Sequence, residues 1–235
     1  MIPMKKILLV EDDPDIIQLL NLHLSEPAYH LTACSSGNEA IQNIRDNAFD
    51  FVLLDIMLPD KDGIEVCKAI REQKIKTPIM MLSSRSEEID KVLALEMGAD
   101  DYMTKPFSIR ELTARIKAHL RSREPVLETV PSEIRFKDLV IDSHLKKATL
   151  KNKRLELTQK EFDLLLQLAQ NPGKTYSRLE LLALVWKYTI SDYEHTVTSH
   201  INRLRIKIEA NISDPQYILT SWGVGYRFAD ETPEQ

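Results

Sequence analysis

The 235-residue chain has little of several features that would assign it to a specialised class. Its two cysteines, Cys34 and Cys67, are far apart and form no C-x-x-C motif, so they indicate reduced thiols of a cytosolic protein. No apolar run is longer than a strand, and we expect no membrane-spanning segment. The N-terminus lacks the long apolar core of a signal peptide. Repeats and low-complexity segments are also absent.

Strong net charge is missing, but the average hides an asymmetry. The chain has 31 basic and 36 acidic residues, which argues against a uniformly basic nucleic-acid binder. Residues 1–122 carry 15 Lys and Arg against 20 Asp and Glu, net −5, whereas residues 131–229 carry 15 against 11, net +4. An acidic first half and a basic second half suggest two domains with partners of opposite charge.

Residues 1–122 alternate five expected strands with five expected helices. This rhythm predicts a doubly wound (βα)5 domain, an open parallel sheet with helices on both faces. The strands are expected at Lys6–Val10, His30–Cys34, Phe51–Asp55, Ile79–Ser83 and Asp101–Thr104, and the helices near Pro14–Ser25, Asn38–Arg45, Gly63–Gln73, Glu87–Met97 and Ile109–Arg121.

The pattern changes in the second half. Residues 123–131 contain two prolines and no periodicity, which predicts a linker. Residues 132–229 combine short strands with three helical stretches, and residues 230–235 are a polar tail. The strands are expected at Ile134–Phe136, Leu139–Asp142, Lys147–Leu150 and Arg154–Leu157, with a hairpin from Tyr217–Ser221 and Tyr226–Phe228 around Gly223 and Gly225. Thr158–Glu161 and Ser177–Glu180 match the capping box that opens a helix.

Acidic residues follow two of the expected parallel strands. Asp55 ends the apolar run that precedes it, and Glu11 and Asp12 follow the first strand, so all three meet at one sheet edge. Clustered carboxylates repel unless a cation neutralises them, and oxygen ligands at an exposed edge suit Mg²⁺. For Asp13 we favour the alternative, an acid that stabilises a helix N-terminus.

Ser83 and Lys105 end two further strands at the same edge. A lone lysine or serine is usually solvated surface. Acids, a metal ion, a lysine and a hydroxyl together are what phosphoryl transfer requires, because its catalysis is mostly positioning and charge neutralisation.

The segments Leu9–Asp13, Leu54–Pro59, Met81–Arg85 and Gly98–Phe107 resemble, in order and spacing, the receiver domain of bacterial response regulators. The resemblance implies that Asp55 accepts a phosphoryl group from a phosphohistidine of a sensor kinase. It implies Mg²⁺ held by Glu11 through water and by Asp12, Asp55 and the carbonyl of Met57. Lys105 and Ser83 would bind the phosphoryl oxygens. Tyr102, by itself equally an ordinary half-buried aromatic, would turn as a switch when Ser83 moves.

Charges of alternating sign lie on the last two helices of this half, at Lys91, Glu96, Asp100, Asp101, Glu111, Arg115 and Lys117. The simple alternative is a solvated face with weak ion pairs. The resemblance implies a symmetric homodimer through this face, with cross-chain pairs Lys91–Glu111 and Asp101–Arg115.

The stretch His195–Glu209 predicts an amphipathic helix. At about 100° per residue, Val197, Ile201, Leu204 and Ile208 form a core stripe, and Ser199, Asn202, Arg203 and Ile206 fall opposite, flanked by Arg205 and Lys207. Outward Asn and Arg in a basic domain suit the major groove of DNA, with flanking cations on phosphates. Taken by itself, the helix is better interpreted as an ordinary amphipathic helix with cationic residues facing solvent.

The segments Leu157–Leu165, Ser177–Leu182, Val185–Trp186, Thr196–Arg205 and Trp222–Phe228 resemble the winged-helix output domain of the OmpR/PhoB family. The resemblance implies a recognition helix at His195–Glu209, a wing at Gly223–Gly225 and a loop at Trp186–Glu194 that touches RNA polymerase. The DNA-binding residues would be Ser199, His200, Asn202, Arg203, Arg205, Lys207, Thr220, Trp222 and Arg227. Asn202 and Trp222 depart from relatives that carry arginine there.

We therefore expect a cytoplasmic transcription factor that dimerises when phosphorylated and binds tandem half-sites on double-stranded DNA. One rival is a phosphatase with Asp55 as nucleophile, but Met57 stands where a second acid would be needed. Another is a regulator that binds DNA constitutively, against which the set of Asp55, Lys105 and Ser83 argues.

Overall fold

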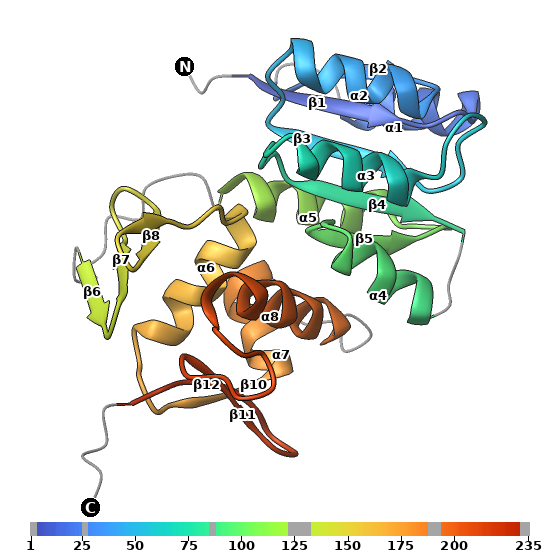
Figure 1. Ribbon diagram of the computed structural model, residues 1–235. Coiled ribbons are helices and arrows are strands. Elements are labelled where there is room, and N and C mark those ends of the chain that lie inside the picture. The colour runs from blue at the N-terminus through green and yellow to red at the C-terminus, as the bar shows by residue number, and fades with distance from the viewer. Residues whose placement is uncertain (1–3, 25–27, 85–87, 122–132, 188–193, 231–235) are drawn as a thin grey trace, which may run out of the picture. The chain divides into compact units, whose positions relative to one another are not determined.

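The computed structural model describes residues 4–24, 28–84, 88–121, 133–187 and 194–230 (Figure 1). The chain divides into two compact units, residues 1–121 and residues 122–235, which are treated separately below. The linker expected at residues 123–131 lies outside the described residues, as does all of the expected tail except Asp230. Among the described residues, no helix is long and apolar enough to cross a membrane.

The N-terminal unit is a parallel sheet with helices on both faces, as the strand–helix rhythm predicted (Figure 1). The five strands lie in the order β2-β1-β3-β4-β5. Helices α2, α3 and α4 pack on one face, and α1 and α5 on the other. The elements are β1 (Lys5–Val10), α1 (Pro14–His23), β2 (Tyr29–Cys34), α2 (Gly37–Asp46), β3 (Phe51–Asp55), α3 (Gly63–Glu72), β4 (Ile79–Ser83), α4 (Glu88–Glu96), β5 (Asp101–Thr104) and α5 (Ile109–Arg121).

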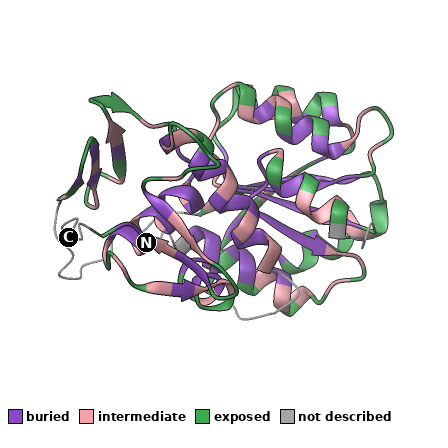
Figure 2. Cartoon of the chain, turned by 60° about the horizontal axis from the view of Figure 1, so that its bottom comes forward, coloured by how far each residue is buried: buried purple, intermediate pink, exposed green. Residues whose placement is uncertain are grey.

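Alternation along each strand explains why both faces are covered. In β1, Ile7 and Leu9 join the core beneath α1 and α5, whereas Leu8 and Val10 join the core beneath α2 and α3. The inner strands are therefore buried along their length (Figure 2). Strand order reverses between β1 and β3, and open sheets of this kind bind ligands at the carboxyl ends of the strands beside that reversal.

The C-terminal unit has two antiparallel sheets with helices between them in the chain. The first sheet has the order β6-β7-β8-β9 and the second β10-β12-β11. The elements are β6 (Glu133–Phe136), β7 (Leu139–Asp142), β8 (Lys147–Leu150), β9 (Lys153–Arg154), α6 (Gln159–Ala169), β10 (Thr175–Ser177), α7 (Arg178–Leu181), the π-helix η1 (Leu182–Trp186), α8 (Glu194–Ile208), β11 (Ile218–Ser221) and β12 (Gly225–Phe228). This arrangement is a winged-helix fold.

Two details of this unit differ from the sequence expectation. The strand expected at Arg154–Leu157 is shorter and lies at Lys153–Arg154, followed by one more hydrogen bond to β8, from Leu155 N to Ala148 O at 2.9 Å. Beyond them Leu157 turns into the core and Thr158 caps α6, so the chain leaves the sheet early. Strand β10 was not expected, because three residues are too few to show a period of two.

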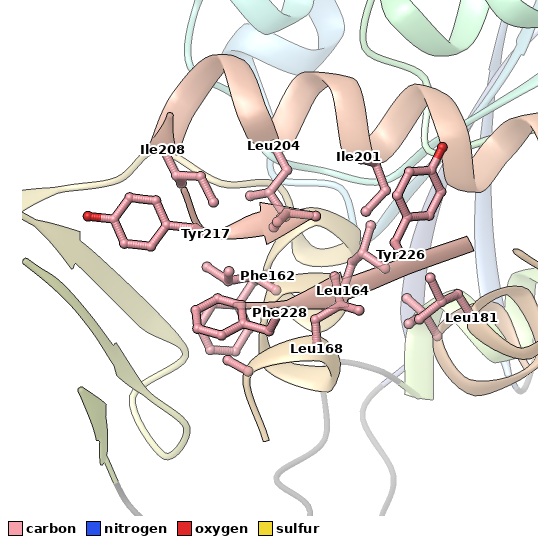
Figure 3. Close-up of a cluster of buried hydrophobic side chains, with 14 of the residues drawn as sticks. Phe162, Leu164, Leu168, Leu181, Ile201, Leu204, Ile208, Tyr217, Tyr226 and Phe228 are labelled. Atoms are coloured by element: carbon pink, nitrogen blue, oxygen red, sulfur yellow. The ribbon is translucent and has the colours of Figure 1, made fainter. Parts of the chain in front are cut away.

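The core of the C-terminal unit lies among α6, α8 and the strands of the second sheet (Figure 3). Phe162, Leu164 and Leu168 of α6 face it, as do the predicted stripe residues of α8 and Tyr226 and Phe228 of β12. Val197, Ile201, Leu204 and Ile208 are all buried, so the predicted core stripe is confirmed. Both predicted capping boxes form, at Thr158–Glu161 and at Ser177–Glu180.

Candidate functional site

The acidic residues predicted from the strand ends lie together at the carboxyl edge of the parallel sheet. Lys105 Nζ donates to Asp55 Oδ2 at 2.7 Å and to Glu11 Oε2 at 2.8 Å. Ligand oxygens of Glu11, Asp12 and Asp55 lie within 4.8 Å of one another. Glu11 and Asp55 are buried, whereas Asp12 is exposed. We call Glu11, Asp12, Asp55 and Lys105 the acidic cluster.

The loop after β3 closes over the acidic cluster. Met57 N donates to Asp55 Oδ1 at 3.1 Å, and Gly63 N donates to Ile56 O at 2.8 Å. A Cβ at Gly63 would lie 2.1 Å from the carbonyl oxygen of Asp55, so only glycine allows α3 to begin so close to the strand end. Local backbone packing thus fixes the orientation of the Asp55 carboxylate.

Electrostatics in the acidic cluster are unbalanced. Burial raises the pKa of Glu11 to about 7, and the charge on Asp55 adds to this effect against the opposing influence of Lys105. Burial disfavours the charge on Lys105, but its hydrogen bonds to Asp55 and Glu11 outweigh burial and raise its pKa. One lysine therefore serves several carboxylates, and a further cation would relieve the repulsion that remains.

The cluster has the donors that Mg²⁺ prefers. Glu11, Asp12 and Asp55 supply only oxygen ligands, and the exposed side of the cluster at Asp12 leaves room for the waters that this ion keeps. These residues fit a divalent cation. By contrast, Asp13 accepts from Asp15 N at 2.8 Å and caps α1, which confirms the structural interpretation of that acid.

The other predicted residues of this edge occupy neighbouring strand ends. Ser83 is buried and follows Leu82, the register partner of Asp55. Lys105 N donates to Ser83 O at 2.7 Å, which ties the ends of β4 and β5 together. Tyr102 is fully buried against the α2–α4 side of the sheet, not half-buried.

One of the predicted cross-chain ion pairs forms within the chain. Arg115 Nη1 lies 3.1 Å from Asp101 Oδ1, Arg115 Nη2 lies 2.7 Å from Glu111 Oε1, and His119 Nε2 lies 3.2 Å from Asp101 Oδ2. Within the chain, α5 lies beside β5, so Asp101 and Arg115 are already paired, and the predicted pairing of these two residues across a dimer stays a prediction. We call Asp101, Glu111, Arg115 and His119 the β5–α5 cluster. Glu96 and Lys117 are exposed and Lys91 is partly exposed.

The exposed stripe of α8 differs in part from the angular prediction. Ile206 is 65% exposed and Asn202 is partly exposed, as expected. Ser199 and Arg203 are buried, so their assignment to an open face was wrong; Arg203 Nε lies 3.7 Å from Glu161 Oε1. A helix packed on more than one side keeps a narrower free stripe than a single core stripe suggests.

Two more predicted DNA contacts take part in packing. His200 is fully buried, with its ring edge-to-face against Trp186 and Nδ1 at 2.7 Å from Thr196 O, and its predicted role in DNA binding stays a prediction. Arg205 Nη2 donates to Ile218 O at 2.7 Å and to Thr220 Oγ1 at 2.8 Å. Arg205 therefore anchors α8 to β11.

The hairpin tip presents an apolar surface. Trp222 is 91% exposed and Val224 is exposed beside it, around Gly223 at φ 74°. Val224 N donates to Ser221 O at 2.9 Å, which closes the turn. Arg227, lower on β12, pairs with Asp230 Oδ1 at 2.9 Å.

Thr198 and Arg178, which the sequence analysis did not single out, also belong to the surface next to Asn202. Thr198 lies four residues before Asn202 on the free stripe and is contacted by Arg178 Nε at 3.4 Å and Tyr226 Oη at 3.5 Å. The guanidinium of Arg178 lies 5.5 Å from the ring centroid of Tyr226. The i, i+4 spacing from Thr198 through Asn202 to Ile206 was the available signal.

The two halves match two protein-family models. Residues 7–117 match the response regulator receiver domain, and residues 152–228 match the C-terminal domain of transcriptional regulatory proteins. With the acidic cluster and the winged helix, these matches define a DNA-binding response regulator of a two-component system. The chain is 45% identical over 233 residues to the alkaline phosphatase synthesis transcriptional regulatory protein PhoP of Bacillus subtilis, covering 96% of this chain and 97% of that one.

Solved structures of similar chains support the same family. DrrB, an OmpR/PhoB homologue of Thermotoga maritima, is 36% identical with a TM-score of 0.52 and covers 97% of this chain and 100% of its own. A mutant of RitR is 28% identical with a TM-score of 0.75 and covers 96% of this chain and 99% of its own. The chain belongs to the OmpR/PhoB family of response regulators.

Proposed function

We propose that Asp55 is the phosphoacceptor of this response regulator. The observation that carries the proposal is Lys105, whose Nζ bridges Asp55 Oδ2 and Glu11 Oε2 at the switch point of the sheet. A carboxylate oxygen of Asp55 attacks the phosphorus of a phosphohistidine on the partner kinase, the P–N bond breaks, and the imidazole leaves.

The neighbouring residues have separate roles in this step. Glu11, Asp12, Asp55 and the carbonyl of Met57 would hold Mg²⁺, with Glu11 acting through water, and the ion would supply positive charge that neutralises the phosphoryl oxygens. Lys105 exchanges its contact with Asp55 Oδ2 for the new phosphoryl group. Ser83 hydrogen-bonds a phosphoryl oxygen, and Tyr102 moves within the space that Ser83 leaves. The same cluster supports slow self-dephosphorylation but not turnover of other substrates.

Phosphorylation favours a homodimer through α4, β5 and α5. The face carries Lys91, Glu96, Asp101, Glu111, Arg115 and Lys117, and the β5–α5 cluster must open before Arg115 can pair across the two-fold axis. Two linked output units then bind tandem half-sites with a higher effective concentration.

In the output unit, α8 enters the major groove and the hairpin lies beside it. Asn202 is the best-placed base contact on the free stripe, and Arg203 becomes one when its guanidinium turns outward. The DNA sugar–phosphate backbone is contacted by Lys207, Thr220, Trp222 and Arg227. The orientation of α8 is set on its protein-facing side by Ser199, His200 and Arg205. The polymerase-contacting loop Trp186–Glu194 lies largely outside the described residues. Because its target is DNA, we place the protein in the cytoplasm.

The test compares Asp55→Asn with Asp62→Asn, a matched loss of charge in the same loop at a helix cap that Asn also supplies. A small phosphodonor with Mg²⁺ should label the wild type and Asp62→Asn, detected by intact mass, and should leave Asp55→Asn unlabelled. Labelling should also tighten DNA binding, which separates this function from a constitutive binder. Undiminished labelling of Asp55→Asn overturns the assignment.

A further inference from the structure

Glu161 makes contacts that its place in a capping box does not require. Its Oε2 accepts from Thr158 N at 2.8 Å, which closes the box at the start of α6. The same oxygen accepts from Lys207 Nζ at 2.6 Å, and Oε1 lies 3.7 Å from Arg203 Nε. Glu161 is buried, so its charge lies between α6 and two cations of α8.

We propose that Glu161 is a positioning residue for DNA recognition: its charge holds Arg203 and Lys207 against α6 and so restricts their use in sequence-independent phosphate contacts. This inference rests on the proposal that α8 reads DNA. Bases of the correct site draw Arg203 out against a defined restraint, whereas phosphates alone do not recover that cost. Glu161 thereby raises the ratio of specific to nonspecific binding.

The electrostatics of the contact support a working restraint. A buried carboxylate is costly unless cations and donors compensate it. Burial acts to raise the pKa of Glu161, but Arg203 and Lys207 outweigh burial and lower it. Oε1 accepts no hydrogen bond among the described residues, so Arg203 is its compensating cation. Removing the charge of Glu161 therefore takes an anionic partner away from two cations of α8, although Lys207 Nζ keeps its hydrogen bond to Glu156 O at 2.9 Å.

The second capping box of the same unit provides a matched control. Glu180 Oε2 accepts from Ser177 N at 2.7 Å, and Glu180 N donates to Ser177 Oγ at 3.1 Å. Glu180 fulfils the capping role while exposed, and no α8 cation appears among its described contacts. Capping thus requires an acceptor but not a buried charge facing α8.

The experiment compares full-length Glu161→Gln and Glu180→Gln, because glutamine keeps the acceptor of each box and removes only the charge. The probes are a duplex enriched from a random library by the wild-type chain and a scrambled duplex of equal composition. Each cation newly available to phosphate releases about 0.9 counterion, so it changes log K by about 0.9 for each tenfold change in salt. If such a contact contributes nothing at about 1 M salt, it should tighten scrambled-duplex binding about fivefold at about 0.15 M. Glu161→Gln should therefore bind scrambled DNA more tightly with a steeper salt slope, and its specificity ratio should fall.

Glu180→Gln should match the wild type in both affinities. Glu161→Gln that weakens both duplexes equally, with a lower melting temperature, means a purely structural role and overturns the inference. Arg203→Ala separates the underlying proposal: if it leaves the specificity ratio unchanged, α8 does not read bases through Arg203. If Arg203→Ala lowers the ratio while Glu161→Gln behaves like Glu180→Gln, only the inference about Glu161 fails.

Discussion

Buried carboxylates in the two units face opposite surroundings. In the acidic cluster, Glu11 and Asp55 share the single cation of Lys105, and burial with the charge of Asp55 raises the pKa of Glu11 to about 7. In the output unit, Glu161 faces both Arg203 and Lys207, which outweigh burial and lower its pKa. The first site has too few cations and the second has too few anions.

The direction of each imbalance matches the ligand proposed above for that unit. A site short of cations is completed by a divalent metal ion, and a surface short of anions is completed by DNA phosphates. The net charges of the two halves, −5 and +4, thus have the same signs as the local imbalances at these two groups of side chains. A balanced cluster should instead contribute mainly stability.

The β5–α5 cluster comes closer to balance, because Glu111 is partly exposed to water and His119 adds a second cation when its imidazole is protonated. Arg115 is buried between Asp101 and Glu111, and His119 lies on the other oxygen of Asp101. Comparing this cluster with the acidic cluster tests whether balance separates stability from function.

The largest expected effect on stability follows from breaking the β5–α5 cluster. Arg115→Met should lower the free energy of unfolding by about 3 kcal/mol or more, because it leaves the buried charge of Asp101 undercompensated. Asp55→Asn should leave stability equal or higher, because it removes one of several mutually repelling carboxylates. Urea denaturation of both variants measures the difference. Equal destabilisation by the two changes would contradict the comparison.

A smaller effect is expected in the output unit. Arg203→Ala should lose about 1–3 kcal/mol on the selected duplex and little on scrambled DNA. Arg227→Ala should weaken both duplexes alike and reduce the salt slope by about one, as expected of the phosphate contact proposed for Arg227. Fluorescence anisotropy across a salt series distinguishes them. A uniform loss for Arg203→Ala would make that residue a phosphate contact.

Much of the N-terminal unit could be predicted from its sequence, and less of the output surface. Strand ends in a parallel sheet converge whatever the side chains do, so Glu11, Asp55 and Lys105 met as expected. On α8, angular position fixed the core stripe but not which polar residues are covered from the sides. Covering Arg203 depends on Glu161, 42 positions earlier in the chain. The sequence likewise does not show whether Arg115 pairs with Asp101 of its own chain or with Asp101 of a second copy, because that depends on which carboxylate is nearer in space.

The smallest predicted effect concerns the open side of the acidic cluster. Asp12 and Asp13 are adjacent and both exposed, yet only Asp12 lies with Glu11 and Asp55, whereas Asp13 caps α1. Asp12→Asn should weaken Mg²⁺ binding by at least about 1 kcal/mol, roughly fivefold to tenfold, because even at 4 Å in bulk water one unit charge pair contributes about this much.

Asp13→Asn should leave Mg²⁺ affinity nearly unchanged, because Asn retains the cap and the removed charge does not face the ion. Isothermal titration calorimetry suits the measurement. Tryptophan fluorescence would not report on this site, because both tryptophans, Trp186 and Trp222, lie in the other unit. If both variants lose affinity equally, Mg²⁺ responds to the overall acidity of the edge. A loss confined to Asp12→Asn instead makes the shortage of cations in the acidic cluster a property of three particular carboxylates.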